Sequence, residues 1–390
     1  MNMNLIPIVL ATDINYAMPT CVALNSILAT KEVSTKYKFI LLIPDHLDEV
    51  VKVKFDMLIK KYPGTTIEYM LMGSQFTQAP SPISHITHVM YYRLIIAELI
   101  PHYDKCIYLD GDVIVKDDLT DLYYYNIKNN YIAGVKALAF QTFFLTGNEQ
   151  WYLDKTGLIS LDQYINSGVL LMNLAAIRRD GLTQRFLDTI SDRLMCPDQD
   201  ILNMVCYNRI SFLPLRYNYQ PVRLADPNIY NAIVDVIYSA EEITNAKSNP
   251  AIIHYLDKVK PWNCLTGIDF ARWWQAALNS PFTDEVWARA EAIQVERNSL
   301  IEQVGMLNDE LTHTRSLNEK LVESEVLSEA TKEQIRNELE MILRSTTWHV
   351  GRFVTFIPRK LKGGIKCIKD HGLSYTIKHS LYKMKTKPTR

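Results

Sequence analysis

The feature that most constrains the fold of this chain is an alternation of short, β-branched apolar runs with stretches of helical length. Residues 16–30 and 46–62 are of helical length, and they follow the first and second of these runs. Strands that alternate with helices in this way predict a parallel α/β sheet with helices on both faces. Four runs are predicted as strands: LIPIVLA (5–11), YKFILLI (37–43), TTIEYMLM (65–72) and KCIYLD (105–110).

Polar residues follow two of these predicted strands directly. The first strand runs into ATDINY (11–16), and the fourth runs into DGD (110–112). In open α/β sheets ligands bind outside the carboxyl ends of the strands, so we expect these two segments to line one site. We predict a catalytic domain over residues 1–280, because the mixed pattern of strands and helices ends there.

Composition indicates the class of protein and its compartment. Of the 390 residues, 48% are apolar and 22% are charged, as in ordinary soluble globular proteins. The six cysteines contain no CxxC pair, which favours a reducing compartment. Residues 1–10 lack the basic flank and the cleavage site of a signal peptide, and we predict a first strand there. No run approaches the roughly 18 apolar residues that span a bilayer, so we expect a cytoplasmic protein that is at most peripheral to the membrane.

Charge is divided unevenly along the chain. Residues 344–390 contain 12 Lys or Arg and one acidic residue, Asp370, although the whole chain has a net charge of −1. Basic residues are interleaved there with aromatic ones such as Trp348 and Phe353, a pattern typical of a segment that lies on an anionic bilayer. We therefore predict that the tail, residues 346–390, associates with the inner face of the cell membrane. A solvated terminus is the alternative, and nucleic acid is not an expected partner, because it would gain nothing from the apolar FVTFI segment.

A different pattern fills residues 284–345. The segment contains no proline and a single glycine, Gly305, and a seven-residue series runs through it from Val286 to Ile342. Seven of the nine positions in this series are apolar, which favours a coiled-coil helix over a surface helix packed on its own domain. The series four residues on is half polar and includes Asn318, a candidate for setting the register. This segment predicts self-association into a homo-oligomer.

The Asp-Gly-Asp segment at 110–112 fits two chemistries. Two carboxylates one residue apart on a tight turn can hold one divalent cation, and Gly111 permits a close approach of the backbone. In the first chemistry the cation neutralises the diphosphate of a nucleotide-sugar. In the second, YLDGDV supplies the nucleophilic aspartate of a haloacid-dehalogenase-like phosphatase. That class needs a later GDxxxD pair, which this chain lacks, and Asp13 and Asn15 suit a nucleotide pocket, so the context favours the metal clamp over the phosphatase. By themselves Asp13 and Asn15 fit the cap of the following helix better, and a solvated turn is the third interpretation of the Asp-Gly-Asp segment.

Seven segments carry a resemblance to a known family: ATDINY (11–16), MYYRLIIAELIP (90–101), KCIYLDGDVIV (105–115), YINSGVLLMNL (164–174), PDQDILN (197–203), LRYNY (215–219) and IIHYLDKVKPW (252–262). In this order they resemble the retaining glycosyltransferases of family 8, which include bacterial lipopolysaccharide galactosyl- and glucosyltransferases. The resemblance implies a GT-A fold, with a mixed sheet flanked by helices. It also implies a UDP-sugar donor, UDP-glucose or UDP-galactose, and a Mn²⁺ cofactor, with Mg²⁺ as the alternative.

The resemblance implies a metal site and a donor site on particular residues. Asp110, Asp112 and His254 would be the ligands of the cation. By itself a histidine on an apolar strand is more often structural, so the role of His254 depends on the motif around it. The residues that would bind the nucleotide and the donor sugar are Ala11, Asp13, Asn15, Tyr16, Arg93, Asp110, Gly111, Asn166 and Lys260.

The resemblance also implies where catalysis takes place. Gln199 and Asp198 would lie beside the anomeric carbon, and His85 would lie close to the sugar or the acceptor. Retaining glycosidases use a carboxylate nucleophile, whereas Gln199 is a neutral amide and a poor nucleophile. We therefore expect front-face attack, in which a UDP oxygen takes the proton of the acceptor and Gln199 steadies the oxocarbenium-like centre.

Two departures from the family pattern leave the function with two interpretations. Asp257 stands where the family often has glycine, and Ala137 or Lys136 stands where an aspartate near the acceptor is expected. The first interpretation is an enzyme that moves glucose or galactose to a glycan or glycolipid in bacterial lipopolysaccharide or surface polysaccharide synthesis. The alternative is a catalytically degenerate, nucleotide-binding scaffold that the coiled coil and the tail recruit to the membrane. A transfer assay with Mn²⁺ separates the two.

Overall fold

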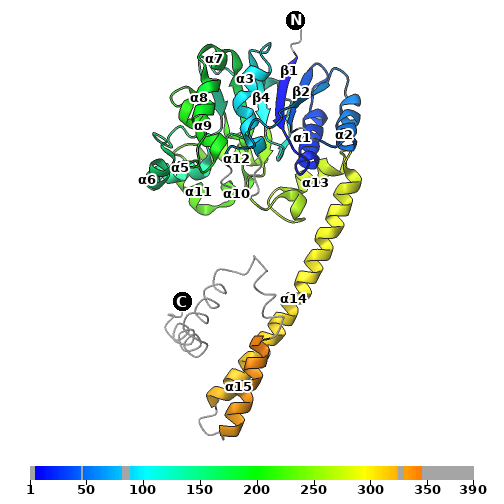
Figure 1. Cartoon of the computed structure of the whole chain (residues 1–390), viewed down its shortest axis with the longest axis vertical. Helices are drawn as coiled ribbons and strands as arrows, with labels where there is room; N and C mark the ends of the chain where they lie inside the picture. Colours follow the sequence, from blue (N-terminus) through cyan, green and yellow to red (C-terminus); the bar gives the residue numbers. More distant parts are fainter. Residues whose placement is uncertain (1–4, 45–46, 81–87, 324–328, 345–390) are drawn as a thin grey trace. The chain divides into compact units, whose positions relative to one another are not determined.

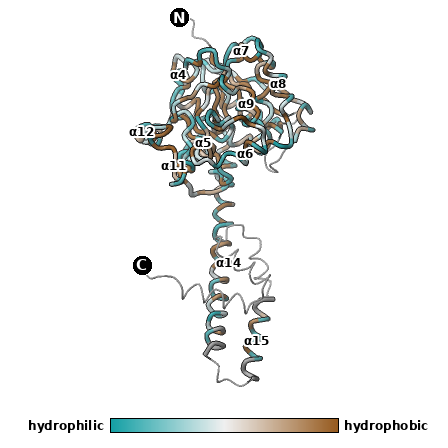
Figure 2. The backbone as a smooth tube through the Cα atoms, turned by 90° about the vertical axis from the view of Figure 1, so that its left-hand side faces the viewer, coloured by the Kyte–Doolittle hydropathy of each residue, from teal (hydrophilic) through white to brown (hydrophobic). Residues whose placement is uncertain are grey.

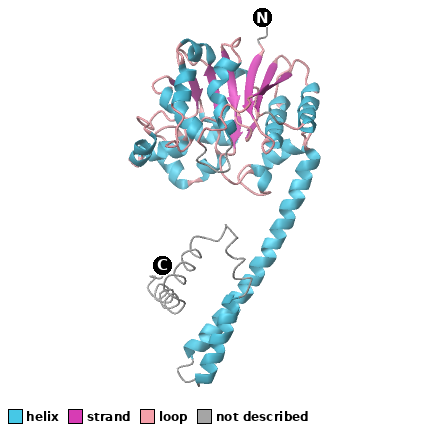
Figure 3. Ribbon diagram, in the orientation of Figure 1, coloured by secondary structure: helices cyan, strands magenta, loops and turns pink. Residues whose placement is uncertain are grey.

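The computed structural model describes residues 5–44, 47–80, 88–323 and 329–344 of the chain. It divides into two compact units, residues 1–294 and residues 295–390. A mixed sheet of seven strands lies at the centre of the first unit, in the order β3-β2-β1-β4-β7-β6-β8 (Figures 1 and 3). The strands are β1 (Ile6–Ala11), β2 (Tyr37–Ile43), β3 (Thr66–Leu71), β4 (Lys105–Leu109), β5 (Val113–Val115), β6 (Ile132–Gly134), β7 (Val169–Asn173), β8 (Ile210–Phe212) and β9 (Ile252–His254).

All four strands predicted from the apolar runs occur, and their ends agree with the prediction to within one residue. These strands form the parallel half of the sheet: β1 pairs with β2 and with β4, and β2 pairs with β3. The other half departs from the all-parallel arrangement that the alternation predicts, because β7 runs antiparallel to both β4 and β6. The sheet is therefore mixed, as the family resemblance implies.

Helices cover both faces of the sheet because successive strand residues point to opposite sides. In β1, Ile8 and Leu10 pack into one apolar cluster with α1, α2 and α13, whereas Val9 packs into another with η1, α3, α7, α8 and α9. All three side chains are fully buried. The α-helices of the first unit up to residue 278 are α1 (Ala17–Ala29), α2 (Glu49–Lys60), α3 (Ile96–Leu99), α4 (Thr120–Tyr123), α5 (Leu138–Leu145), α6 (Gln150–Thr156), α7 (Leu174–Arg179), α8 (Leu182–Asp188), α9 (Pro197–Val205), α10 (Pro221–Ala225), α11 (Pro227–Ile233), α12 (Ala240–Ser248) and α13 (Phe270–Leu278).

The described residues of the first unit also form 3₁₀ helices and a second, small sheet. The 3₁₀ helices are η1 (His88–Ile95), η2 (Leu215–Asn218) and η3 (Pro261–Asn263). Strands β5 and β9 pair antiparallel, with Val113 opposite His254. This pairing brings His254 next to the Asp-Gly-Asp turn, which lies between β4 and β5.

The segment with the seven-residue series is helical where it is described. Helix α14 (Thr283–Glu323) begins in the first unit and continues into the second, and α15 (Glu329–Arg344) lies wholly in the second. Hydrophilic and hydrophobic residues alternate along α14 in Figure 2. A long helix fits the predicted coiled coil, which stays a prediction. None of the helices described here has the length and apolar character needed to cross a bilayer, and the tail predicted to bind membrane, 346–390, lies outside the described residues.

Candidate metal and donor-binding site

A cleft of about 920 Å³ opens where β1 and β4 end. Its walls come from the turns after these two strands, from η1, from the start of α9, from the segment after β9 and from the start of α14. Of the residues predicted from the sequence, His85 lies outside the described residues. The other 13 all line this cleft: Ala11, Asp13, Asn15, Tyr16, Arg93, Asp110, Gly111, Asp112, Asn166, Asp198, Gln199, His254 and Lys260.

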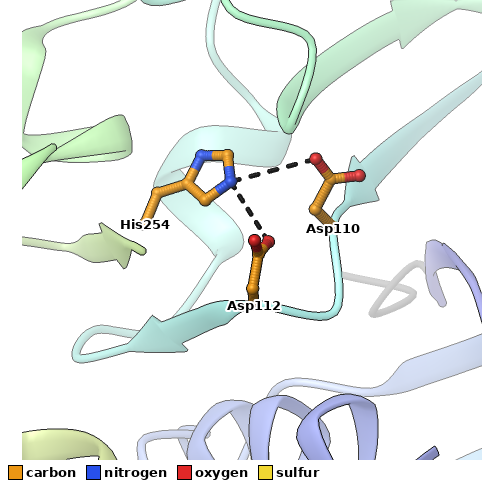
Figure 4. Close-up of side chains that lie close together, drawn as sticks. All are labelled: Asp110, Asp112 and His254. Atoms are coloured by element: carbon orange, nitrogen blue, oxygen red, sulfur yellow. Dashed lines mark ion pairs between the residues drawn. The ribbon is translucent and has the colours of Figure 1, made fainter. Parts of the chain in front are cut away.

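Asp110, Asp112 and His254 point toward one another in the cleft (Figure 4). The Nε2 atom of His254 lies 3.1 Å from Oδ1 of Asp112 and 3.9 Å from Oδ2 of Asp110. One potential ligand atom from each of the three residues lies within 4.8 Å of the other two. Two carboxylate oxygens and an imidazole nitrogen at this spacing can share one divalent cation, and this mixed oxygen and nitrogen set suits Mn²⁺ as well as Mg²⁺.

The ring of His254 is held in the orientation that a metal ligand needs. Its Nδ1 lies 3.0 Å from Oδ1 of Asn218, and the amide nitrogen of Asn218 donates to Oδ1 of Asn166 at 2.8 Å. Since the amide oxygen of Asn218 can only accept, Nδ1 of His254 donates to it, and Nε2 is the ring nitrogen that would offer its lone pair to a cation held between it and the carboxylates. Asn218 is fully buried on η2, and it fixes the tautomer as a metal site requires.

Two glycines keep space open around these ligands. A Cβ atom on Gly168 would lie 2.1 Å from Cε1 of His254 and 2.6 Å from Oδ2 of Asp110. A Cβ atom on Gly111 would lie 2.4 Å from Oγ1 of Thr20, which is on α1. Any side chain at Gly168 would therefore occupy the space between two of the three ligands, and a side chain at Gly111 would push the Asp-Gly-Asp turn away from α1.

Lys260 lies against the same carboxylates. Its Nζ donates to Oδ2 of Asp112 at 2.7 Å and to the carbonyl oxygen of Tyr255 at 2.5 Å. Burial raises the pKa of Asp112, but the positive charge of Lys260 and its hydrogen bond are the main effects that lower it further, so that the net pKa lies well below the ordinary value. Asp112 is therefore an anion over the whole physiological pH range, as a metal ligand must be.

Arg93 joins the Asp-Gly-Asp turn to the start of α9. One terminal nitrogen donates to Oδ1 of Asp110 at 2.7 Å, and the other lies 3.2 Å from Oδ2 of Asp198 and donates to the backbone of Ser167. The guanidinium also lies over the ring of Tyr108, 4.4 Å from its centroid. Burial lowers the pKa of Arg93, yet the two carboxylates raise it by more, so the side chain keeps its charge. Arg93 thus orients two acidic residues from separate segments.

Gln199 and Asp198 begin helix α9, where Pro197 occupies the first turn and needs no hydrogen bond of its own. The Oε1 atom of Gln199 accepts from Nδ2 of Asn166 and from the backbone of Ser167, each at 3.0 Å. Its Nε2 donates to the hydroxyl of Tyr164 at 3.2 Å. With both ends of the amide engaged, the orientation of Gln199 at the cleft wall is fixed.

The buried carboxylate of Asp200 holds the tyrosine that orients Gln199. Oδ1 of Asp200 accepts hydrogen bonds from the hydroxyls of Tyr152 and Tyr164, and its Oδ2 accepts from the backbone of Met195 and Cys196. Burial raises the pKa of Asp200 by more than these hydrogen bonds lower it. The polar chain from Asp200 through Tyr164 to Gln199 is therefore structural support for the cleft wall.

The opposite wall comes from the turn after β1. Oδ1 of Asp13 accepts from the backbone N–H groups of Asn15 and Tyr16, at 2.9 and 3.0 Å, which is the geometry of an Asx-turn. The N-cap position of α1 is Tyr16, so Asp13 is not the cap of that helix. The ring of Tyr16 makes an edge contact with Trp262, with the centroids 5.6 Å apart. Burial, then the nearby carboxylates of Asp112, Asp110 and Asp13, raise the pKa of the Tyr16 hydroxyl, which stays neutral.

The structure shows the surroundings of the two departures from the family pattern, Asp257 and the pair Lys136 and Ala137. Asp257 lines the cleft, but its Oδ1 lies 3.5 Å from a terminal nitrogen of Arg223, on α10. Lys136 donates to the carbonyl oxygen of Asp162, and Ala137 is buried next to it at the start of α5. The charge of Asp257 is thus partly compensated, whereas the expected acceptor aspartate has no acidic substitute at positions 136 and 137.

Sequence reasoning missed three residues that the geometry singles out. Asn218 and Gly168 lie inside segments that carried the family resemblance, but neither residue type signals a metal site by itself. Arg289 also lines the cleft, from the first turns of α14, and it lies beyond the predicted catalytic segment. An arginine on a predicted coiled coil is normally a solvated surface residue, so no pattern could have marked it.

Comparison with known proteins assigns the family. The sequence profile described as glycosyl transferase family 8 matches residues 7–266, and the chain belongs to this family. A lipopolysaccharide 1,2-glucosyltransferase of Escherichia coli is 30% identical over 268 residues, which cover 64% of this chain and 71% of the relative. The lipopolysaccharide 1,3-galactosyltransferase of Salmonella typhimurium is 24% identical over 254 residues, or 61% of this chain and 68% of the relative.

Solved structures agree with the fold. The galactosyltransferase LgtC, in complex with donor and acceptor sugar analogs, is 27% identical and superposes with a TM-score of 0.56 over 70% of this chain and 96% of its own. The bifunctional glycosyltransferase WbbM superposes with a TM-score of 0.63 at 22% identity, over 73% of this chain and about half of its own length, 51%. The fold of the first unit is the GT-A fold that the sequence resemblance implied.

Proposed function

We propose that this chain is a retaining hexosyltransferase that moves glucose or galactose from a UDP-sugar to a hydroxyl group of a glycan or glycolipid. The observation that carries the proposal is the convergence, in one cleft, of 13 residues drawn from segments spread between Ala11 and Lys260. Membership of family 8 and relatives that act on lipopolysaccharide support an acceptor in bacterial lipopolysaccharide or another surface polysaccharide.

Asp110, Asp112 and His254 are proposed to hold Mn²⁺, or Mg²⁺ in its place. The residues fit such an ion on three counts: their ligand atoms converge, Asn218 presents the lone-pair nitrogen of His254, and Gly168 leaves the necessary space. A bound cation supplies a Lewis acid that neutralises the charge of the leaving diphosphate.

The protein residues of the cleft are proposed to bind and orient the donor. Asp13 and Asn15, with Ala11 and Tyr16, hold the uridine at the end of β1. Lys260, which already lies in the cleft, places its ammonium near the diphosphate, where a fixed positive charge stabilises the departing group. Arg93 keeps its position between Asp110 and Asp198, so it aligns the diphosphate side of the site with the sugar side.

Retention of configuration is proposed to proceed by front-face attack. Gln199 lines the cleft as a neutral amide whose oxygen already accepts two hydrogen bonds, so it is a poor nucleophile. Asp198 pairs with Arg93 and accepts a hydrogen bond from the hydroxyl of Ser167. Burial raises the pKa of Asp198 by more than these two contacts lower it, so its pKa lies above the ordinary value. The proton of the acceptor passes to an oxygen of the leaving UDP, and Gln199 contributes its dipole beside the oxocarbenium-like centre.

A transfer assay tests this proposal directly. The purified chain is incubated with UDP-glucose or UDP-galactose, Mn²⁺ and a set of lipopolysaccharide-derived oligosaccharides, and the anomeric configuration of the product is read by NMR. We expect an α-linked product from one of the two donors, because the α-configuration of the donor is retained. A product of inverted configuration contradicts the mechanism, and binding of UDP-sugars without transfer or hydrolysis favours the scaffold alternative.

Self-association through α14 is proposed as a second property of the chain. Several large apolar side chains on the two predicted seam series of this helix are exposed, namely Leu300 at 37%, Val304 at 50% and Leu311 at 45%. A coiled coil with a second copy would cover such residues. Light scattering of the full chain tests the proposal: we expect a dimer or higher oligomer, and a Val304→Glu variant should shift it toward the monomer, whereas a monomeric parent chain contradicts it.

Membrane association is proposed for residues 346–390 because of their charge and aromatic content, as the sequence indicates. Deletion of these residues is expected to release the protein from vesicles that contain anionic lipid while transfer to a soluble acceptor continues. Equal vesicle binding by the full and the shortened chains contradicts the proposal. Sedimentation with neutral vesicles provides the control, since charge attraction should be absent there.

A further inference from the structure

The first turns of the long helix α14 belong to the unit that carries the cleft. Phe282 and Val286 are buried in the same apolar cluster as α1 and α2, and the ring of Phe282 makes an edge contact with Phe55 of α2, with the centroids 6.4 Å apart. Lys54 pairs with Glu285 and donates to the carbonyl oxygen of Pro281 at 3.1 Å. The start of α14 is thus fixed to the body of this unit.

Arg289 follows Val286 by one helical turn and reaches the segment just after Lys260. Its Nε donates to the carbonyl oxygen of Trp262 at 3.0 Å, and one terminal nitrogen donates to Oδ1 of Asn263 at 2.6 Å. Trp262 and Asn263 form the end of η3, which begins one residue after Lys260. A single guanidinium therefore ties the beginning of α14 to the turn that sets the direction of the Lys260 side chain.

The turn held by Arg289 is also part of the cleft wall. Trp262 is 7% exposed and contacts both Tyr16 and Trp273, with ring centroids 5.6 Å away in each case. Trp262, Asn263 and Arg289 all line the cleft. A shift of this turn would therefore move the wall next to Tyr16 as well as the ammonium of Lys260.

The guanidinium of Arg289 has different partners from that of Arg93, the other arginine that lines the cleft. Arg93 contacts the carboxylates of Asp110 and Asp198. Arg289, in the part of the chain that the structure describes, donates to two neutral oxygens and has no carboxylate within ion-pair distance. Glu285, one turn earlier on α14, also lines the cleft but pairs with Lys54. The guanidinium of Arg289 is therefore available at the edge of the cleft to attract an anionic ligand.

We propose that Arg289 is a positioning residue of the donor site, so that the first turns of α14 form part of that site. This inference rests on the proposed function for the identity of the donor. Arg289 holds η3 in place, and with it Lys260, and its charge favours the diphosphate-bearing ligand. Loss of these contacts affects donor binding, because the groups that surround the anomeric carbon, Gln199 and Asp198, lie on α9.

Steady-state kinetics of full-chain variants test this role. Arg289→Ala removes two hydrogen bonds from a charged donor, and we expect the KM for the UDP-sugar to rise about tenfold while kcat changes by less than about threefold. Arg289→Lys keeps the charge without the forked contact, and an intermediate rise is expected. Arg297→Ala is the control, because Arg297 is exposed on the same helix but lies in the second unit; its KM should equal that of the parent chain.

The partner of Arg289 provides a coupling test. Asn263→Ala should also raise the KM for the UDP-sugar. The KM of the double variant should be about equal to that of Arg289→Ala alone, since both substitutions break one shared contact. Additive effects of the two substitutions contradict a shared action through η3. An unchanged KM for Arg289→Ala, relative to the Arg297→Ala control, overturns the proposal.

Hydrogen exchange separates this inference from the proposed function. Backbone amides of residues 258–264 should exchange faster in Arg289→Ala than in Arg297→Ala, with or without any donor present. If the parent chain transfers no hexose from either UDP-sugar, the proposed function fails, and the exchange rates still decide whether Arg289 holds the turn. Equal exchange in the two variants overturns the positioning role even where transfer is observed.

Discussion

One acidic cluster precedes strand β5 and another follows it, and only the first has the geometry of a metal site. Asp110 and Asp112 precede the strand and face the large cleft. Asp117 and Asp118 follow it and line a separate cleft of about 370 Å³. Both clusters are rich in carboxylates, so the number of acidic side chains does not distinguish them.

The neighbours of the carboxylates distinguish the two clusters. Asp118 accepts hydrogen bonds from the backbone of Glu32 and Thr120, each at 2.8 Å, and Asp117 pairs with Arg216. The oxygens of Asp118 thus join the start of α4 to the segment after α1, and the carboxylate of Asp117 is paired with η2. Asp110 and Asp112 also have cationic partners, Arg93 and Lys260, but the second oxygen of each faces the buried Nε2 of His254, with open space kept by Gly168. The lesson is that convergent lone pairs define a cation site, whereas a local excess of carboxylates does not.

The two clusters should differ most in activity when one aspartate of each is substituted. Asp112→Asn should reduce metal-dependent transfer by at least about a hundredfold, because a metal ligand and the partner of Lys260 are both weakened. Asp118→Asn should leave kcat/KM within about twofold of the parent. Circular dichroism should show that both variants are folded. Full activity of Asp112→Asn would contradict the metal assignment.

Binding of the cation itself gives the second test. Because a ligand of the native state raises stability, Mn²⁺ at about 100 times its Kd should raise the Tm of the parent chain by about 5 °C. The same shift is expected for Asp118→Asn and none for Asp112→Asn. A shift that is lost in Asp118→Asn instead would place the cation in the smaller cleft.

Stability as a function of pH sharpens the structural role of the second cluster. Burial raises the pKa of Asp118, but hydrogen bonds from Thr120 and from the backbone of Glu32 lower it more, so the net native pKa lies below the unfolded value. Its ionised form therefore stabilises the protein above the unfolded pKa of about 3.9, and this contribution is lost as the pH falls through the native pKa. Asp118→Asn should cost about 1 kcal/mol at pH 7.

Urea unfolding of this variant and of the parent chain, at neutral pH and at about pH 3, measures the effect. The difference in the free energy of unfolding should narrow at the lower pH, where the parent begins to lose the same interaction. A difference that stays constant over this interval would show that the charge of Asp118 contributes nothing, leaving only the shape of its side chain.

The smallest expected effect concerns a carboxylate within the large cleft. Arg223→Ala should raise the KM for the UDP-sugar by about twofold, since it leaves the charge of Asp257 uncompensated near an anionic ligand and such half-exposed pairs are weak. In a chain that already carries Asp257→Gly, adding Arg223→Ala should not change the KM further. A rise that persists in the double variant would mean that Arg223 acts on the donor independently of Asp257.

The sequence predicted those parts of the fold that have a long, local pattern. Strands β1, β2, β3 and β4 each contain five to seven residues with strong apolar character, and they could be located to within one residue. Strands β5 and β9 have three residues each, which is too short for a period to appear. The antiparallel direction of β7 depends on which strands it lies between, and no local pattern encodes that.

The site was predictable to a different extent for different residues. Asp110 and Asp112 could be inferred because two acids after a buried strand are unusual, whereas His254 followed only from the family resemblance, since an isolated histidine on an apolar strand looks structural. Arg93 was expected next to the donor sugar, and the structure shows in addition that it connects Asp110 with Asp198. This role depends on distances between segments that no spacing in the sequence records.

The pairing of β5 with β9 determines when, during synthesis of the chain, the proposed cation site can form. Val113 lies opposite His254, so the third ligand reaches the first two only after most of the first unit has been synthesised. A growing chain that has exposed Asp110 and Asp112 but not yet His254 offers two solvated carboxylates and no converging nitrogen. Because domains fold as units during synthesis, the proposed site forms only once the chain through β9 has been made, and a chain that stops short of β9 lacks the third of the proposed ligands.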